Sequence, residues 1–401
     1  MGFYTSPSFF MASAFLVVPA AVLGLTGRSM RAYGMTASCL MMALLFAGNP
    51  QGLAALGVFL TIASLGAYAV HRSWCTEGGA KSLAVYRAAL LSTIVALVIY
   101  KVGAVFDRDL LGFIGISYIT FKAVQVLIEM RDGLIERMDP LDYLYFLTFF
   151  ATFTSGPIDR SRRFVEDIHA PRPRSDYADL LTRGVMMMFA GAAMQLVLAT
   201  IARGFYDASC APAGTLTLDA LTMPVACREV LRAYGYAAYL FFDFAGYSLM
   251  AMGLGRCFGI AVPANFRAPY IAVDIKDFWN RWHITLSTWL RDFVFMRFVR
   301  MATKRKLFSS RLQTACAAYM VDMALMGAWH GLTVDYLAYG IYHGVLLAVT
   351  EVYQKRSSFH KRHRKEGWYK VASWFVTLQL VVLGFALFSG QVSGLIAAAL
   401  G

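Results

Sequence analysis

The sequence is poor in charge. Only 15% of its 401 residues are Asp, Glu, Lys or Arg, whereas 58% are hydrophobic and the mean hydropathy is +0.55. Soluble domains usually carry about 25% charged residues. Apolar runs recur from end to end, and no polar block is large enough to form a soluble domain. The composition therefore excludes an ordinary soluble protein. It predicts an all-α polytopic membrane protein with a single transmembrane domain over residues 1–401.

Motifs that mark several well-known catalytic centres are also missing. The 6 cysteines include no Cys-x-x-Cys pair and show no metal-ligand spacing, so we predict no metal site. There is no Gly-x-Ser-x-Gly elbow, no His-Glu-x-x-His zinc motif and no Gly-x-x-x-x-Gly-Lys phosphate loop. These absences argue against serine-hydrolase, zinc-peptidase and nucleotide-hydrolysing chemistry.

Acidic residues are few relative to basic ones. The chain has 24 Asp and Glu against 37 Lys and Arg, which gives a net charge of +13. Such a balance can indicate nucleic-acid binding, but the cytoplasmic loops of membrane proteins also collect Lys and Arg. Because the chain is so apolar, we interpret the excess as this cytoplasmic bias. We expect a multi-pass protein of the cytoplasmic membrane, with the lipid bilayer and not nucleic acid as its partner.

Apolar segments recur at the length that a bilayer requires. A transmembrane helix needs about 20 mainly apolar residues, and several candidate segments are shorter or carry charges. We predict about 11 transmembrane helices plus re-entrant helices. The distribution of basic clusters leaves open whether the segments near 141–158 and 278–298 are re-entrant. The candidate segments are Ser8–Leu25, Thr36–Ala47, Leu53–Val70, Val85–Phe106, Leu110–Met130, Leu141–Phe153, Val185–Ala202, Val230–Gly255, Phe278–Phe298, Thr314–Ala328, Leu332–Tyr353 and Trp368–Phe388.

The stretch from Asp274 to Gly344 is rich in polar and aromatic side chains. It reads D-I-K-D-F-W-N-R-W-H-I-T-L-S-T-W-L-R-D, and after a basic link it continues with M-G-A-W-H-G and Y-G-I-Y-H-G. Ionisable groups at membrane depth are costly, usually face an internal cavity, and are functional candidates by default. His283 and His330 each follow a tryptophan. We predict that these two histidines form the centre of the chemistry.

The spacing around His283 predicts one helix over Lys276–Asp292. With 3.6 residues per turn, Asn280, His283 and Ser287 share one polar stripe of this helix. A helix that also carries Arg281 and Arg291 cannot face lipid on all sides, so we expect it to line a cavity. An interfacial amphipathic helix is the alternative. A bulky stripe lies beside the polar one and consists of Trp279, Trp282, Leu286 and Trp289. 

A neutral imidazole is the side chain best suited to take a proton near pH 7, and burial favours its neutral form. The chemistry that remains is a base-assisted attack by a hydroxyl group on an activated acyl group inside the membrane. A thioester donor needs no nucleotide, which agrees with the missing nucleotide motif. Asp243 lies among aromatic residues in F-F-D-F-A-G-Y-S, and we expect it to support the site.

Several of these motifs carry a family resemblance. The segment Asp277–Asp292 resembles the signature of the membrane-bound O-acyltransferases (MBOAT), and W-H-G at 329–331 is similar to the segment that carries their intramembrane histidine. Further motifs are similar to the branch that transfers D-alanine to lipoteichoic acid. Alginate O-acetylases share the core, but they typically read Ile-Pro-Leu-Gly-Gly soon after it, where this chain reads M-R-F-V-R. The motifs of the D-alanyl branch lie at Gly115–Tyr118, Thr154–Arg160, Phe241–Ser248 and Phe295–Arg297.

The resemblance implies a ring of helices around a central tunnel. It also implies an acyltransferase that takes D-alanine from the phosphopantetheine thioester of a carrier protein on the cytoplasmic side. The acceptor is a hydroxyl of an extracellular polymer such as lipoteichoic acid, so the activity belongs to cell-wall biosynthesis. His330 corresponds to the catalytic base, and His283 aids positioning or proton transfer. Residues expected in the tunnel or at the substrate are Trp279, Asn280, Arg281, Trp282, Ser287, Arg291, Trp329 and Asp243.

The resemblance also implies partners but no tightly bound cofactor. These are the acidic carrier protein, a small single-span membrane partner, and a polyol-phosphate or glycan acceptor. Because carrier proteins are acidic, a basic cluster after the signature is a candidate docking surface, with cytoplasmic charge bias as the alternative. The cluster consists of Arg297, Arg300, Lys304, Arg305 and Lys306.

Two other functions stay open at this point. One is an O-acetyltransferase for an exopolysaccharide, since no single residue distinguishes an alanyl from an acetyl donor. The other, from a different class, is an exporter or channel for the polymer that makes no bond. The identity of the acceptor polymer is likewise open.

Overall fold

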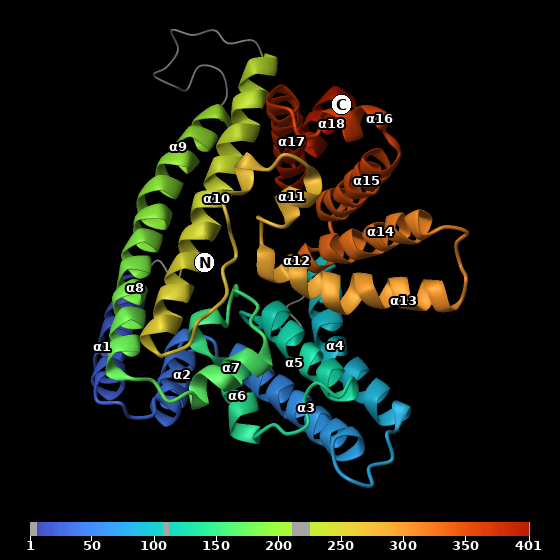
Figure 1. Ribbon diagram of the computed structural model, residues 1–401. Coiled ribbons are helices and arrows are strands. Elements are labelled where there is room, and N and C mark those ends of the chain that lie inside the picture. Colours follow the sequence, from blue (N-terminus) through green and yellow to red (C-terminus); the bar gives the residue numbers. More distant parts are fainter. Residues whose placement is uncertain (1–5, 107–111, 211–224, 401) are drawn as a thin grey trace. The chain divides into compact units, whose positions relative to one another are not determined.

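The computed structural model describes residues 6–106, 112–210 and 225–400 (Figure 1). Every regular element in these ranges is a helix, so the all-α prediction is confirmed. Residues 110–111, at the predicted start of the segment Leu110–Met130, lie outside the described residues. Within that segment the helix α5 begins at Ile116.

The chain divides into two compact units. Unit 1 comprises Met1–Gly191 and Tyr247–Ala264, and unit 2 comprises Ala192–Gly246 and Asn265–Gly401. The helix α10 (Val225–Cys257) contributes residues to both. The other helices that begin in unit 1 are α1 (Pro7–Leu25), α2 (Arg31–Leu45), α3 (Pro50–Trp74), α4 (Leu83–Val105), α5 (Ile116–Arg131), α6 (Pro140–Thr148), η1 (Phe150–Thr152), α7 (Ser161–His169) and α8 (Arg174–Ala192).

Unit 2 contains the candidate functional residues. Its helices besides α10 are η2 (Ala193–Leu198), α9 (Ala199–Cys210), η3 (Pro269–Ile271), α11 (Ile275–Trp279), α12 (Ile284–Leu290), η4 (Arg291–Phe295), α13 (Met296–Lys304), α14 (Arg311–His330), α15 (Val334–Arg356), α16 (Ser358–His363), α17 (Gly367–Phe388) and α18 (Gln391–Leu400).

Six helices in the described part of the chain are long and apolar enough to cross a membrane. They identify a multi-pass membrane protein. The prediction of about 11 spans goes beyond these six and stays a prediction. The six are Ser8–Leu25, Pro50–Trp74, Leu83–Val105, Arg174–Cys210, Cys227–Cys257 and Gly367–Phe388.

Local sequence explains where several helices start. At α1, α3 and α6 a polar residue is followed by proline, and the side chain of the polar residue caps the helix. Asn49, for example, accepts a hydrogen bond from the backbone N–H of Gly52 at 2.8 Å. Proline suits the next position because its missing N–H would have no partner in the first turn. The pair of cap and proline therefore fixes the start of the helix.

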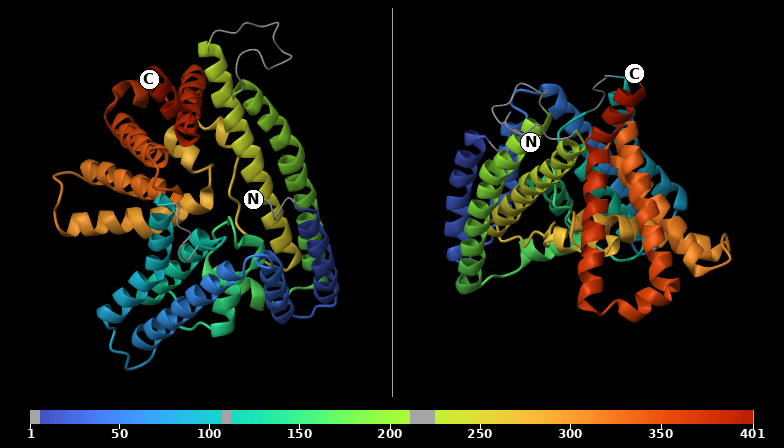
Figure 2. Two further views of the ribbon diagram at one scale, coloured as in Figure 1. Left: turned by 180° about the vertical axis from the view of Figure 1, so that it is seen from behind. Right: turned by 90° about the horizontal axis from the view of Figure 1, so that it is seen from above.

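The core of unit 1 forms around α5. Thirteen residues of this helix are buried, namely Ile116 and every residue from Ile119 to Met130. Helices α3 and α4 pack against each other and against α5 (Figure 1, Figure 2). Because α5 is buried on every side, its polar residues Lys122, Gln125 and Glu129 need partners inside the protein.

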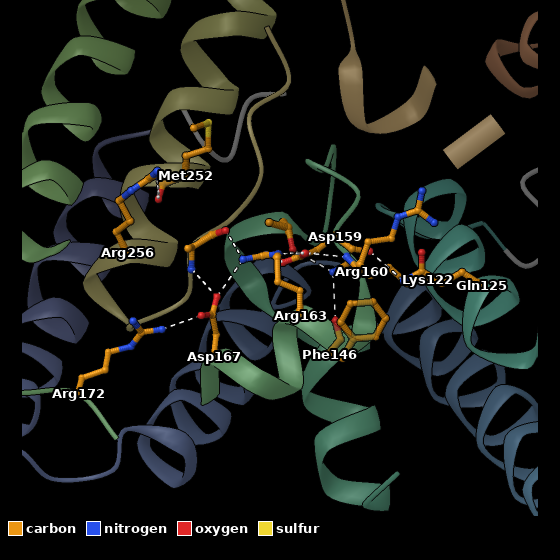
Figure 3. Close-up of polar contacts among 12 residues, drawn as sticks. Lys122, Gln125, Phe146, Asp159, Arg160, Arg163, Asp167, Arg172, Met252 and Arg256 are labelled. Carbon is orange, nitrogen blue, oxygen red and sulfur yellow. Dashed lines mark hydrogen bonds and ion pairs between the residues drawn. The ribbon is translucent and has the colours of Figure 1, made fainter. Parts of the chain in front are cut away.

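Figure 3 shows the polar network that supplies partners for Lys122 and Gln125. Lys122 donates from Nζ to the carbonyl oxygen of Phe146 at 3.1 Å and to the hydroxyl of Thr152 at 2.9 Å. Gln125 donates to the backbone carbonyl of Asp159 at 2.9 Å. The carboxylate of Asp159 in turn pairs with Arg163. The network therefore ties α5 to the segment that precedes α7.

Replacing Asp159 with alanine is expected to destabilise the protein. The carboxylate is 1% exposed, and its removal leaves the part-buried guanidinium of Arg163 with fewer partners. We expect a loss of about 2–4 kcal/mol in the free energy of unfolding, since breaking a buried pair from one side is costly. Thermal unfolding of the purified protein in detergent measures it.

Asp179→Ala provides the matched control. This residue forms a pair of the same i,i+4 type with Arg183, but both side chains are exposed, so its loss should cost less than about 1 kcal/mol. Equal effects of the two variants would contradict a special role of burial at Asp159.

Candidate functional site

The chain around His283 is not one helix. The prediction of a continuous helix over Lys276–Asp292, and of a single apolar segment over Phe278–Phe298, was wrong. Helix α11 ends at Trp279, and α12 begins at Ile284. His283 stands just before α12 with φ 44° and ψ 50°, in the left-handed region. Non-glycine residues adopt this conformation rarely, and mostly where the surrounding structure imposes it.

Asn265 is the residue that imposes the break. Its backbone carbonyl accepts a hydrogen bond from the N–H of Ile284 at 2.9 Å. Its side-chain oxygen accepts from the N–H of Thr285 at 3.2 Å and from the hydroxyl of Thr285 at 2.7 Å. The N–H of Arg267 also donates to the carbonyl of Arg281 at 3.0 Å. The neighbouring segment thus takes up backbone groups that a continuous helix would have paired internally.

The structure brings the two predicted histidines to one tryptophan. The ring centroids of His283 and Trp329 lie 6.3 Å apart, and those of Trp329 and His330 lie 4.7 Å apart. Trp329 is 8% exposed and therefore occupies the interior between the two imidazoles. Residues that are 47 positions apart in the sequence, 283 and 330, are thus joined through a single indole ring.

His283 is almost completely buried, at 3% exposure. It lies outside the six apolar spans. Its ring packs edge-on against that of Phe244 on α10, with 4.8 Å between the ring centroids. Burial, and secondarily the nearby His330, lowers the pKa of the His283 imidazole to about 3. His283 is therefore neutral at physiological pH, and it is a weaker proton acceptor than an exposed histidine.

His330 is the last residue of α14 and is only partly buried. Its ring lies 5.1 Å from that of Phe388 at the end of α17 and 6.2 Å from that of Tyr336 on α15, measured between centroids. The backbone leaves the helix directly at Gly331, which is extended. A partly accessible imidazole at the end of a helix is able to meet a substrate while its surroundings hold the ring.

A cavity of about 420 Å³ lies in the same unit, and neither the two histidines nor Trp329 is among its lining residues. Its walls come from α11, α12, η4, α14 and α15. The cavity is lined by Arg267, Lys276, Asp277, Trp279, Asn280, Ile284, Ser287, Thr288, Leu290, Arg291, Phe295, Tyr319, Asp322, Met323 and Leu347. Its polar groups include three basic side chains, two carboxyl groups and several hydroxyl or amide groups. Such a lining suits a ligand that is anionic at one end and polar along its length.

Four of the residues expected at the substrate line this cavity. They are Trp279, Asn280, Ser287 and Arg291. The indole N–H of Trp279 also donates to Nδ1 of the fully buried His343 at 3.3 Å.

Arg281, Trp282 and Asp243 have other surroundings. Arg281 pairs with Asp277 one turn earlier at 2.7 Å. Trp282 packs in the aromatic core, with its ring 4.8 Å from that of Phe385. Asp243 accepts a hydrogen bond from Gln195 at 3.0 Å. None of the three is among the residues that line the cavity.

The predicted docking cluster lies on and after α13. Arg300, Lys304, Arg305 and Lys306 are exposed, whereas Arg297 is partly buried with its guanidinium 5.9 Å from the ring centre of Phe293. Ala302 on the same helix is buried. Four of the five side chains are therefore accessible to a partner in the isolated chain.

The family model described as MBOAT, membrane-bound O-acyltransferase family, matches residues 57–389. This match covers most of the chain, including the histidines, Trp329 and the cavity. The chain belongs to the membrane-bound O-acyltransferase family. The protein is therefore an acyltransferase.

Relatives of this acyltransferase fall into two groups by name. It is 37% identical over 399 residues to the teichoic acid D-alanyltransferase of Bacillus subtilis, covering 97% of this chain and 98% of that protein. It is 33% identical over 394 residues to the enzyme of the same name from Lacticaseibacillus rhamnosus, covering 96% of each. A probable alginate O-acetylase AlgI of Pseudomonas syringae is 31% identical over 287 residues, covering 69% of this chain and 49% of that protein.

Sequence reasoning missed two residues of this region. Asn265 lies in an irregular segment outside the motifs, and nothing local signals its hydrogen bonds to residues 284 and 285. Asp322 lines the cavity and is 9% exposed. It is the one acidic residue in the helix that leads to His330. Its position in an apolar helix was a signal by the same rule that identified the histidines.

Replacing Asn265 with alanine is expected to lower acyl transfer about tenfold or more. The substitution removes the side-chain acceptor that holds the start of α12 directly after His283, and misplaced reacting groups lose rate steeply. Initial rates of acyl transfer by the purified variant measure the effect.

Asn49→Ala serves as the control for stability alone. It removes the cap of α3 in unit 1, which should cost about 1 kcal/mol in the free energy of unfolding and leave the rate unchanged. An Asn265→Ala enzyme of full activity would exclude a positioning role.

Proposed function

We propose that this acyltransferase moves a D-alanyl group onto a hydroxyl of a teichoic acid at the cell surface. The observation that carries the proposal is the likeness to teichoic acid D-alanyltransferases over almost the whole of both chains. The likeness to alginate O-acetylases stops at about half the length of those proteins. This partial likeness makes acetyl transfer to a polysaccharide the second candidate function.

In the proposed reaction the acceptor hydroxyl attacks the carbonyl carbon of a D-alanyl thioester. The new C–O bond forms, the C–S bond breaks, and D-alanine becomes an ester. His330 accepts the hydroxyl proton and passes it to the leaving thiolate, so that the donor departs as a thiol. Its partial exposure at the end of α14 supports this role. A positioned general base contributes about 10²–10⁴-fold to a rate.

His283 acts as a positioning residue in this scheme. Its low pKa makes it a poor base near pH 7, and its burial and left-handed backbone hold the ring in one orientation. Through Trp329 it supports the surface against which His330 packs. The division of work between a buried and an accessible imidazole therefore follows from their surroundings.

The donor is the phosphopantetheine thioester of an acidic carrier protein at the cytoplasmic face. The cavity lined by α11, α12 and α14 receives the arm, and Arg267, Lys276 and Arg291 in its lining suit the phosphate. No cofactor stays bound between turnovers. The exposed basic cluster on and after α13 docks the carrier, and a small single-span protein assists the transfer in the cell membrane.

Replacing His330 with alanine is expected to abolish surface D-alanylation. Loss of the base should reduce ester formation by at least about 100-fold, while membrane insertion persists. Alanine released by mild base from whole cells, quantified by mass spectrometry, measures the effect. Immunoblots of membrane fractions verify the amount of protein.

His360→Ala is the matched control, because this histidine lies on α16 and bonds to Tyr369. It should leave ester content unchanged. Normal ester content in His330→Ala cells would refute the enzyme mechanism and favour a transporter that makes no bond. Acetate in place of alanine among the released products would favour the second candidate.

Reversing charge on the basic cluster is expected to weaken capture of the carrier. In the triple variant Arg300→Glu, Lys304→Glu and Arg305→Glu, three exposed cations become anions that repel an acidic partner. We expect at least about a tenfold rise in the dissociation constant, with a steep dependence on salt. Surface plasmon resonance with the D-alanylated carrier measures it.

The control reverses three basic residues on and after α16, namely Lys361, Arg362 and Arg364, which carry comparable exposed charge. It should bind the carrier as the unaltered protein does. Equal weakening by both triple variants would reduce the effect to net charge and remove the docking assignment.

A further inference from the structure

Asp322 is a buried carboxyl group with an unused acceptor. It lies on α14, lines the cavity, and is 9% exposed. Its Oδ1 atom is shielded from solvent and has no hydrogen-bond partner among the described residues. Polar atoms in protein interiors almost always have a partner, because leaving one unsatisfied costs free energy. The unused oxygen therefore points to a partner that the cavity receives.

Two of the three cations that line the same cavity contact other carboxylates or amides. Lys276 pairs with Glu351 and also donates to Gln354 at 2.9 Å. Arg291 pairs with Asp292 at 3.1 Å. Neither forms an ion pair with Asp322. Asp322 thus keeps its acceptor available to a ligand.

The lining defines the chemistry of that ligand. The unpaired Oδ1 of an ionised Asp322 accepts hydrogen bonds, so it suits a ligand that presents an N–H or O–H group. Three basic side chains in the same lining favour a ligand with an anionic group at one end. A chain that ends in a phosphate and carries amide N–H groups meets both requirements. The phosphopantetheine arm is such a chain.

Spacing along α14 selects one amide of that arm. Asp322 and His330 are eight positions apart on one helix, which corresponds to about 12 Å along the axis at 1.5 Å per residue. The second amide nitrogen of pantetheine, counted from the sulfur, is eight bonds from the thioester carbonyl carbon. At roughly 1.2 Å per bond in an extended chain this is about 10 Å. During the attack the acceptor hydroxyl lies between the thioester carbonyl carbon and His330, which adds about 3 Å to the distance that the arm has to span. The first amide, four bonds nearer, is too close to His330 to reach Asp322.

We propose that Asp322 is a donor-positioning residue whose carboxylate accepts a hydrogen bond from the second amide N–H of the pantetheine arm. The assignment rests on the proposed function for the identity of the donor. The contact would let the enzyme select donors by the length of the arm, because an amide bound at Asp322 brings the thioester within reach of His330.

Two synthetic donors test the assignment by transfer. D-alanyl-S-pantetheine contains both amides, whereas the D-alanyl thioester of N-acetylcysteamine contains only the first. In Asp322→Leu we expect kcat/KM for the pantetheine thioester to fall about 10- to 100-fold, as for loss of a hydrogen bond to a charged group, mainly through KM. The value for the shorter donor should stay unchanged. Asp322→Asn keeps an acceptor oxygen, so its kcat/KM for the pantetheine thioester should lie between the values of Asp322→Leu and the unaltered protein.

Binding of free pantetheine tests the same contact without chemistry. Isothermal titration calorimetry of the full-length protein in nanodiscs should show pantetheine bound about 10- to 100-fold more weakly by Asp322→Leu than by the unaltered protein. Asp207→Leu, which removes an exposed carboxylate on α9, is the matched control and should bind pantetheine normally.

The outcomes separate this assignment from the proposed function. Equal pantetheine affinity in Asp322→Leu and the unaltered protein, or equal losses for both donors, would overturn the role of Asp322. Absence of D-alanyl transfer from either thioester by the unaltered enzyme would instead overturn the proposed function. Weakened pantetheine binding in Asp322→Leu would still support the contact in that case.

Discussion

The geometry of the site depends on the hydrogen bonds that Asn265 makes to the start of α12. In these bonds the backbone N–H and the hydroxyl of Thr285 donate to the side chain of Asn265, and this contact holds His283 in the left-handed region. A left-handed conformation at a non-glycine residue costs of order 1–3 kcal/mol and persists only where its surroundings over-determine it. Without these bonds α11 and α12 would tend to merge, and the imidazole would turn with the helix. The strained backbone of His283 therefore helps to set the orientation of its imidazole ring.

A second constraint is the burial of aromatic rings around the two histidines. Trp282 packs on Phe385, Phe244 packs on His283, and Phe388 packs on His330. The rings fix the orientation of each imidazole by shape, and they exclude water from one histidine more than from the other. Burial therefore differentiates two residues of the same chemical type. One is neutral inside the protein, and the other is partly exposed at a helix end.

The sequence was sufficient to predict the all-α membrane class, the family and the association of His283 with His330. These inferences rest on composition and on long motifs, both of which survive local irregularity. It was not sufficient to predict the break after Trp279, because Lys276–Asp292 has good helical periodicity. The break comes from Asn265, which is distant from the motif and has no pattern of its own. Tertiary hydrogen bonds override local periodicity in such a case.

The same limit applies to the individual site residues. Asn280 and Ser287 line the cavity although the continuous helix that placed them on one stripe with His283 is broken, whereas Trp282 packs in the core. Sequence neighbours diverge because the broken helix changes the direction of each side chain. Asp322 shows the opposite case, in which a residue outside the motifs lines the cavity because α14 passes along it.

The packing of α14 on α15 has a mechanical consequence. A Cβ atom on Gly327 would lie 2.5 Å from the carbonyl oxygen of Tyr336, and one on Gly340 would lie 2.5 Å from the carbonyl oxygen of Met323. The two backbones touch with no side chain between them, one turn before His330. The ends of α14 and α15 that meet near His330 therefore form a rigid pair, and neither helix can turn or shift without separating from the other. The His330 imidazole therefore keeps its place relative to α15, and any movement that opens or closes its surroundings has to come from other parts of the chain.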